Sequence, residues 1–190
     1  PSSLNMRDAA PKGAVAYLII ADRMFEEALK PFVEWKIAKG FAVKVGYTDE
    51  IGTTNETIQA YIHGLYNNPT PDFPAPTFVL FVGDHEQIPA WKGETGSHIS
   101  DLYYVDVTND NIPDMFHGRF SAQTVDELLP QVQKTLEYEQ YTMEDPSFLK
   151  KVVLTAGWDY SHTFAWGWPQ INYGLKYYFN AAHGIDIQHV

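Results

Sequence analysis

The chain has 190 residues, of which 45% are hydrophobic and 19% are charged, and its formal net charge at pH 7 is −11. This length and balance are typical of a globular domain with its own core, and no apolar run is long enough to cross a membrane. The acidic charge argues against nucleic acid as a partner, because phosphate binding needs clustered Lys and Arg. The sequence also has no cysteine, so the chain can supply neither a disulfide nor a thiol nucleophile.

The first part of the chain combines a strand-like pattern with a helix-like one. Residues 14–21 form a nearly continuous apolar run, which is typical of a strand buried on both faces. Apolar residues then follow helical spacing from Phe25 to Ile37. Gly40 is placed to end this helix, and Pro31 predicts a kink or a fresh turn within it.

Two further strands are expected on either side of a second helix. The strands are predicted at residues 41–47 and 77–82 from their apolar and β-branched composition. Between them, Thr53 and Glu56 are spaced as a capping box ahead of a helix whose apolar face runs through residues 58–66. A proline-rich linker separates this helix from the strand that follows.

The second half begins with an acidic segment, for which we expect a hairpin, and then returns to the same alternation. Thr124 and Glu127 predict another capping box, followed by a helix at residues 128–136. A strand is expected at residues 152–155 and a last helix at residues 171–179.

These repeated strand–helix units predict an α/β fold with a mostly parallel sheet and helices on both faces. Residues 1–13 are expected to form an N-terminal extension, and residues 14–190 one subdomain. Gly184 is placed to cap the last helix, and residues 185–190 begin a strand that stops. Because a parallel strand needs neighbours and a return connection, we expect this chain to be the first half of a larger fold.

Residues 100–120 concentrate oxygen-bearing side chains around a turn. Calcium takes six to eight oxygen ligands, both carboxylates and backbone carbonyls, and the spacing Asp110-x-Ile112-x-Asp114 lets such groups converge. The alternative is a solvated acidic turn, since Asn and Asp are good turn formers. The residues concerned are Asp101, Asp106, Asn109, Asp110, Asn111 and Asp114.

Residues directly after the strands are further candidates, because ligands of open α/β sheets bind outside the carboxyl ends of the strands. Asp84 follows the strand at 77–82, and Asp159 follows the strand expected at 152–155. A turn or helix N-cap is the structural alternative for both. Ser161 and His162 lie close to Asp159 in sequence, but a catalytic triad needs side chains from separated segments, so we reject a triad here.

Several stretches, in this order, resemble the gingipains, which are secreted bacterial cysteine endopeptidases. The resemblance runs from about Ala14 to Gly184 and is greatest to the lysine-specific members. Each stretch alone has low specificity, whereas the ordered series is specific. The matching stretches are EALKPFVEWKIAKGF, YTDEIGTTNETI with the following AYIH, VGD at 82–84, SDLYY, NIPDM with the following GRFSA, DELL with the following YE, and AGWDYS.

The resemblance implies a caspase-like, three-layer α-β-α fold of two side-by-side subdomains, of which this chain would be the first. It also implies a calcium site. Thr108 stands where the lysine-specific members carry a carboxylate. The ligands implied are the carboxylates of Asp84, Asp110 and Asp114 and the main-chain carbonyls of Val107 and Ile112.

The resemblance further implies that catalysis needs both subdomains. The nucleophilic Cys, the catalytic His and most of the specificity pocket would lie beyond Val190, in agreement with the lack of cysteine. Asp159 matches the acidic residue that orients the catalytic His. We therefore expect part of a secreted or cell-surface endopeptidase that cleaves protein or peptide substrates after a basic residue, lysine before arginine. Alone, without the remaining catalytic subdomain, the chain should be inactive.

Two other hypotheses compete with this one. The first is a non-catalytic module derived from the same fold and used for calcium-dependent binding. The second is an unrelated flavodoxin-like or receiver-type domain, which the lack of a phosphate-cradling glycine loop disfavours. The sequence after Val190 would separate a peptidase from a binding module, because a His–Gly pair and a Cys at successive strand ends would identify the peptidase.

Overall fold

The computed structural model describes residues 13–93, 98–155, 160–162, 165 and 167–185. It divides into two compact units, the N-terminal unit (Pro1–Gln140) and the C-terminal unit (Tyr141–Val190). Each unit is described by itself. No helix among the described residues is both long and apolar enough to cross a bilayer.

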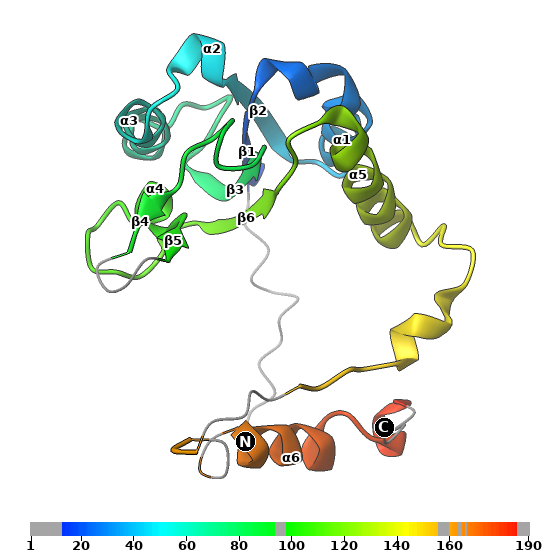
Figure 1. Cartoon of the computed structure of the whole chain (residues 1–190). Helices are drawn as coiled ribbons and strands as arrows, with labels where there is room; N and C mark the ends of the chain where they lie inside the picture. The colour runs from blue at the N-terminus through cyan, green and yellow to red at the C-terminus, as the bar shows by residue number, and fades with distance from the viewer. Residues whose placement is uncertain (1–12, 94–97, 156–159, 163–164, 166, 186–190) are drawn as a thin grey trace. The chain divides into compact units, whose positions relative to one another are not determined.

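A parallel sheet of four strands forms the centre of the N-terminal unit (Figure 1). Its spatial order is β2-β1-β3-β6, and each neighbouring pair is parallel. The predictions for residues 14–21, 41–47 and 77–82 are thereby confirmed. The strands are β1 (Ala16–Ala21), β2 (Ala42–Tyr47), β3 (Pro76–Val82) and β6 (Phe116–Phe120).

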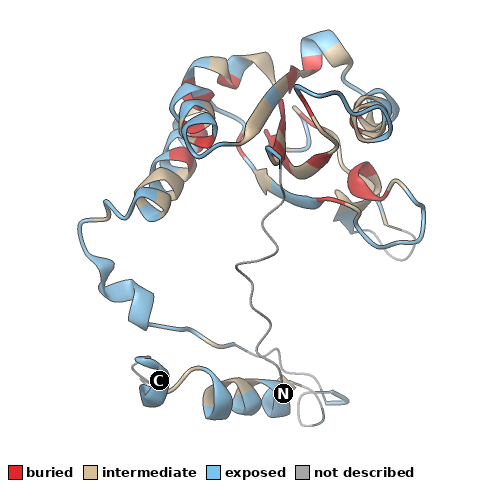
Figure 2. Cartoon of the chain, turned by 180° about the vertical axis from the view of Figure 1, so that it is seen from behind, coloured by how far each residue is buried: buried red, intermediate tan, exposed pale blue. Residues whose placement is uncertain are grey.

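Helices cover both faces of this sheet, as the alternating pattern predicted. Helices α1 (Glu26–Ala38) and α5 (Val125–Gln140) share one core with β-strand residues such as Ile19. Helices α3 (Asn55–Asn67) and α4 (Leu102–Val105) share the other core with Leu18. Adjacent residues of β1 thus point to opposite cores, as the twofold repeat of a strand requires. Figure 2 shows the buried residues concentrated on the strands and on the helix sides that face them.

Short elements connect these layers. The helical turns are η2 (Arg23–Phe25) and α2 (Thr48–Ile51), which follow the first two strands. A small antiparallel ribbon pairs β4 (Trp91–Lys92) with β5 (Ile99–Ser100). The expected hairpin is therefore present, but it precedes the acidic turn instead of flanking it.

The helix boundaries test the capping predictions. Gly40 ends α1 with a left-handed φ of 91°, and its amide bonds to the carbonyl of Ile37, as predicted. The capping box before α3 is one residue later than expected. The Thr54 hydroxyl accepts from the amide of Thr57, and the Thr57 hydroxyl accepts from the amide of Thr54. Two hydroxyls one turn apart satisfy both amides without Glu56.

The other capping box is half present. The amide of Glu127 donates to the Thr124 hydroxyl at 3.3 Å, but the Glu127 carboxylate accepts from the amide of Gln123, not from that of Thr124. Pro31 and Pro130 both lie inside helices that continue past them.

The segment before the acidic turn is helical, although its aromatic and β-branched residues are of the types that favour strands. Helix α4 carries Tyr104 and Val105, which are both buried in the same core. Successive side chains of a strand would point to opposite faces, so a helical turn is the conformation that places both residues in one core.

The C-terminal unit contains short helices. They are η3 (Pro146–Lys150), α6 (Trp168–Tyr177) and η5 (Ala181–His183). The last predicted helix is thus confirmed, but Gly184 caps η5 and not α6. Residues 152–155 do not form the expected strand, because no described residue pairs with them and Val153 is 88% exposed. The strand expected at 185–190 lies, apart from Ile185, outside the described residues.

Candidate functional site

The candidate site lies at the carboxyl edge of the sheet, where β3 and β6 end. The amide of Gly83 bonds to the carbonyl of Phe120, and the amide of Asp84 bonds to the carbonyl of Ala122, both at 2.9 Å. Strand pairing therefore continues past both strands and fixes Asp84. Gly83 has a φ of 136°, and a Cβ there would lie 2.7 Å from that of Gln87, so this sharp turn requires glycine.

Asp84 is held as an ionised carboxylate at this edge. One oxygen accepts from the Ser121 hydroxyl at 3.1 Å and from the amide of His85 at 2.9 Å, and the other accepts from Nε2 of Gln123 at 3.0 Å. These hydrogen bonds, that from Gln123 above all, lower the pKa of Asp84. Its backbone also forms the expected turn, because its carbonyl accepts from the amides of Gln87 and Ile88.

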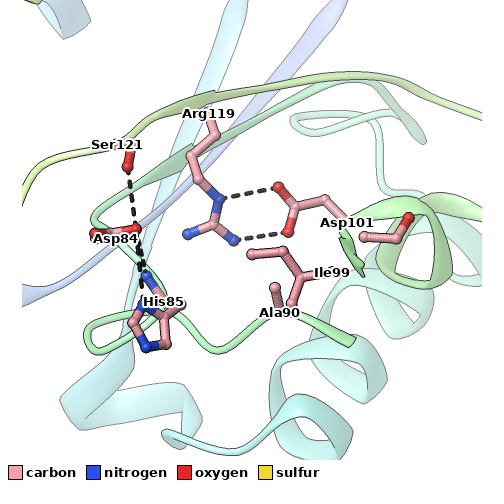
Figure 3. A pocket seen from close by; sticks show the side chains of 8 residues that line it. Asp84, His85, Ala90, Ile99, Asp101, Arg119 and Ser121 are labelled. Carbon is pink, nitrogen blue, oxygen red and sulfur yellow. Dashed lines mark hydrogen bonds and ion pairs between the residues drawn. The ribbon is translucent and has the colours of Figure 1, made fainter. Parts of the chain in front are cut away.

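Arg119 and Asp101 form a mostly buried ion pair beside Asp84 (Figure 3). Nε and Nη2 of Arg119 donate to the two Asp101 oxygens at 2.9 and 2.7 Å. Nη1 donates to the carbonyls of Gly83 at 2.7 Å and Ile88 at 3.1 Å. The guanidinium also lies 5.4 Å from the ring centroid of Phe81. One side chain therefore joins three segments of the edge.

These residues line a pocket of about 170 Å³ that mixes charge with two apolar walls (Figure 3). The sequence places Asp101 only among the acidic side chains around the turn, and no motif within it singles out Arg119. Both lie in stretches that resemble the gingipains, SDLYY and GRFSA, which was the available signal. The lining residues are Asp84, His85, Ala90, Ile99, Ser100, Asp101, Arg119 and Ser121.

The acidic loop (residues 106–114) is organised by its own carboxylates. Oδ2 of Asp114 accepts from the amides of Val107 at 2.7 Å and Thr108 at 3.0 Å, which together with the Thr108 hydroxyl lower the pKa of Asp114. Asp106, only 3% exposed, accepts from the amides of Asp110 at 3.2 Å and Asn111 at 2.9 Å. The turn-forming role that the sequence left open is therefore present.

The predicted calcium ligands are distributed over two places. Asp84 lies at the sheet edge, and the other four lie in the acidic loop. In the part of the chain that the structure describes, no three His, Cys, Asp or Glu side chains are grouped so that they could hold a metal ion. The donors are all oxygens, which calcium prefers, but Asp84 lies beside Ala122 past the carboxyl end of β6, whereas Asp114 precedes the amino end of β6 at Phe116, so the structure does not bring Asp84 to the other four. Asp159 lies outside the described residues.

The parallel sheet between two helical layers and its polar carboxyl edge agree with comparisons to known proteins. The chain belongs to peptidase family C25, whose sequence pattern matches residues 10–185. It is 45% identical over 172 residues to a Lys-gingipain of Porphyromonas gingivalis, a match that covers 90% of this chain and 10% of that protein. A gingipain R of the same species is 30% identical over 141 residues, a match that covers 73% of this chain and 19% of that protein.

Solved structures agree with the sequence matches. One, described as the structure of a protease, superposes with a TM-score of 0.81 at 45% identity and covers 89% of this chain and 38% of that one. The crystal structure of the arginine-specific cysteine proteinase gingipain R gives a TM-score of 0.58 at 31% identity. That match covers 66% of this chain and 28% of the other. The resemblance to gingipains and the caspase-like α/β fold are thus confirmed. The chain spans about a tenth of the length of its Lys-gingipain relative.

Proposed function

We propose that the full-length protein is a secreted or cell-surface cysteine endopeptidase that cleaves proteins after a basic residue, lysine before arginine. The observation that carries this proposal is the 45% identity to a Lys-gingipain over 90% of the chain, against 30% to a gingipain R over 73%. This chain would supply the N-terminal part of the catalytic domain.

Within that enzyme, the chain would support the chemistry without performing it. A thiolate–imidazole mechanism needs a Cys, and this chain has none, so the nucleophile would come from the rest of the protein. Asp159 would accept a hydrogen bond from the catalytic His, fix its tautomer and stabilise the imidazolium beside the thiolate. The 190-residue chain alone should therefore not cleave peptides.

We further propose that the protein binds calcium. The carboxylates of Asp110 and Asp114 and the carbonyls of Val107 and Ile112 would hold the ion in the acidic loop. Asp84, the fifth ligand that the resemblance implies, lies at the other end of β6 in this structure. A calcium ion would neutralise the carboxylates of the loop and stabilise its turns. It would have no part in bond cleavage, and its effect would be on stability.

The peptidase proposal is tested with purified full-length protein and matched Lys-Xaa and Arg-Xaa peptide substrates. We expect thiol-dependent cleavage with a higher kcat/KM for lysine, blocked by a thiol alkylating agent. Cleavage that survives alkylation would refute the cysteine mechanism. If neither substrate is cleaved and calcium-dependent capture of a protein is found instead, the chain belongs to the alternative, a non-catalytic binding module of the same fold.

A further inference from the structure

Residues 141–155, at the start of the C-terminal unit, are accessible along their whole length. Each of them is exposed or half-buried, and Val153 is 88% exposed (Figure 2). After η3 ends, residues 152–155 have no regular secondary structure, and no described residue pairs with them. Exposed stretches of this kind are where proteases cut folded proteins, because a protease binds its substrate as an extended chain.

Lys151 lies at the point where η3 gives way to this unpaired stretch. It is exposed, and its backbone is extended, with a φ of −111° and a ψ of 132°. On its amino-terminal side, η3 is an exposed 3-10 helix of 5 residues, and such short helices have poor hydrogen-bond geometry and open readily. The chain on both sides of the bond between Lys151 and Val152 can therefore enter a peptidase cleft at little cost.

The other described lysines are held in place by backbone hydrogen bonds. Lys39 is the nearest competitor, because it is exposed and also follows a helix. Its amide bonds to the carbonyl of Trp35 at 3.0 Å, and the amides of Gly40 and Phe41 bond back into α1 at 2.9 and 3.1 Å. Lys150 is the last residue of η3. The remaining lysines lie within α1, β2, β4, α5 or α6, and they are Lys30, Lys36, Lys44, Lys92, Lys134 and Lys176.

Cleavage after Lys151 would leave the core of the N-terminal unit whole. Among the described residues, all those that are buried lie between Ala16 and Val132. The contacts of Glu139 with α1 also precede the cut. The sheet and both of its helical layers would therefore stay on one fragment, and Asp159 would be carried by the other.

We propose that the bond between Lys151 and Val152 is a self-cleavage site of the full-length peptidase. The inference rests on the lysine specificity proposed above. The thiolate supplied by the rest of the protein attacks the carbonyl carbon of Lys151, a thioester forms, and the C–N bond breaks. The amine of Val152 leaves with the proton of the catalytic imidazolium. Water then hydrolyses the thioester, which leaves a carboxylate on Lys151 and restores the thiolate.

The accessibility of the bond is measured first, on the complete 190-residue chain with a small amount of an unrelated lysine-specific serine endopeptidase. Intact mass and N-terminal sequencing identify each new terminus over time. Among the bonds that follow the described lysines, the bond after Lys151 should be cut first, and the fragment that ends there should keep a cooperative thermal transition. An earlier cut after any other described lysine, or loss of that transition, would overturn the assignment.

Self-cleavage is then measured with the purified full-length protein. We expect the wild type to form a fragment that begins at Val152 and a thiol alkylating agent to prevent it. Lys151→Gln should lose this fragment but still cleave a Lys-Xaa peptide, which shows that the variant is folded and active. Lys151→Arg should form it more slowly, because lysine is preferred to arginine. Lys39→Gln is the matched control at the end of another helix, and it should form the fragment at the rate of the wild type.

The outcomes separate this proposal from the proposed function. If the wild type cleaves a Lys-Xaa peptide but forms no terminus at Val152, self-cleavage is overturned and the peptidase proposal stands. A terminus at Val152 that still forms after alkylation or in Lys151→Gln would also overturn it, because another protease would then be responsible. If neither the peptide nor the protein is cleaved, the peptidase proposal fails, and self-cleavage fails with it.

Discussion

Glu139, near the end of α5, should stabilise the packing of this helix on α1 through a mostly buried cluster of charges. Its carboxylate accepts from Nζ of Lys36 at 2.6 Å, from Nε1 of Trp35 at 2.9 Å and from Nζ of Lys39 at 3.3 Å. The side chains of Lys36 and Glu139 are only 8% and 20% exposed. Removal of Glu139 would leave the Lys36 ammonium buried without its carboxylate.

The cost of that change can be bounded. Removing one partner of a buried ion pair costs about 3–5 kcal/mol, because the other charge stays buried. Lys36 also lies about 5 Å from the ring centroids of Tyr17 and Phe32, which stabilise a cation, so we expect about 3 kcal/mol for Glu139→Ala. This corresponds to a fall in Tm of about 10 °C. Replacing both partners, Lys36→Met with Glu139→Leu, should restore most of the loss.

The effect should also depend on pH. Burial by itself would raise the pKa of Glu139, but the hydrogen bonds from Lys36 and Trp35 outweigh it, and the pKa is lowered. A carboxylate with a lowered pKa in the folded state stabilises the protein above its unfolded pKa, and this contribution is lost as the pH falls through the folded value. The difference in the free energy of unfolding between the wild type and Glu139→Ala should therefore become smaller in acid.

The assay is urea unfolding followed by circular dichroism, at neutral pH and at about pH 3. Glu137→Ala is the control, since Glu137 lies on the same helix, contacts Gln133 at the surface, and should change stability by less than about 0.5 kcal/mol. A cost for Glu139→Ala below about 1 kcal/mol at neutral pH, or one that is the same in acid, would refute the buried-pair argument.

Four further outcomes are expected. Thr54→Ala should destabilise the chain by about 1 kcal/mol in a thermal melt, while Thr53→Ala should be neutral; the reverse order would mean that the cap is misplaced. Gly83→Ala should cost about 2 kcal/mol or more, and a stable variant would contradict the left-handed turn. Chelator should lower the Tm of the wild type but not that of Asp110→Ala; an unchanged wild type would argue against calcium. In the full-length enzyme, Asp159→Asn should lower kcat by roughly one to four orders of magnitude on a Lys-Xaa substrate with little change in KM, whereas wild-type kcat would indicate a structural cap.

The sequence predicted the sheet well because its strands are buried on both faces. Residues 14–21 and 77–82 are almost entirely apolar, and such runs leave few alternatives to a central parallel strand. Tyr104 and Val105 were harder, because their composition favours a strand and only the core that both must enter makes them helical. Thr53 and Thr54 are chemically alike, so the spacing to Glu56 pointed to the wrong threonine.

The site was less predictable, since it depends on contacts between distant parts of the chain. Asp84 was expected from its place after a strand, and the structure confirms that place at the sheet edge. The bonds of Arg119 to Asp101 and to the turn at 83–88 depend on the register of β3 against β6, in which Arg119 lies opposite Phe81. No local pattern specifies such a register. The predicted set of calcium ligands and the role of Asp159 stay predictions.

The order of strands in the sheet has a consequence during biosynthesis. Strand β1 is translated first but lies inside the sheet, between β2 and β3. Its partner Phe78 on β3 is made long after Tyr17, and at about 5–20 residues per second the delay is on the order of several seconds. For that time one edge of a highly apolar strand has no native neighbour. A nascent chain of this kind needs protection from other nascent chains, so its yield should depend on translation rate and on chaperones as well as on the stability of the finished fold.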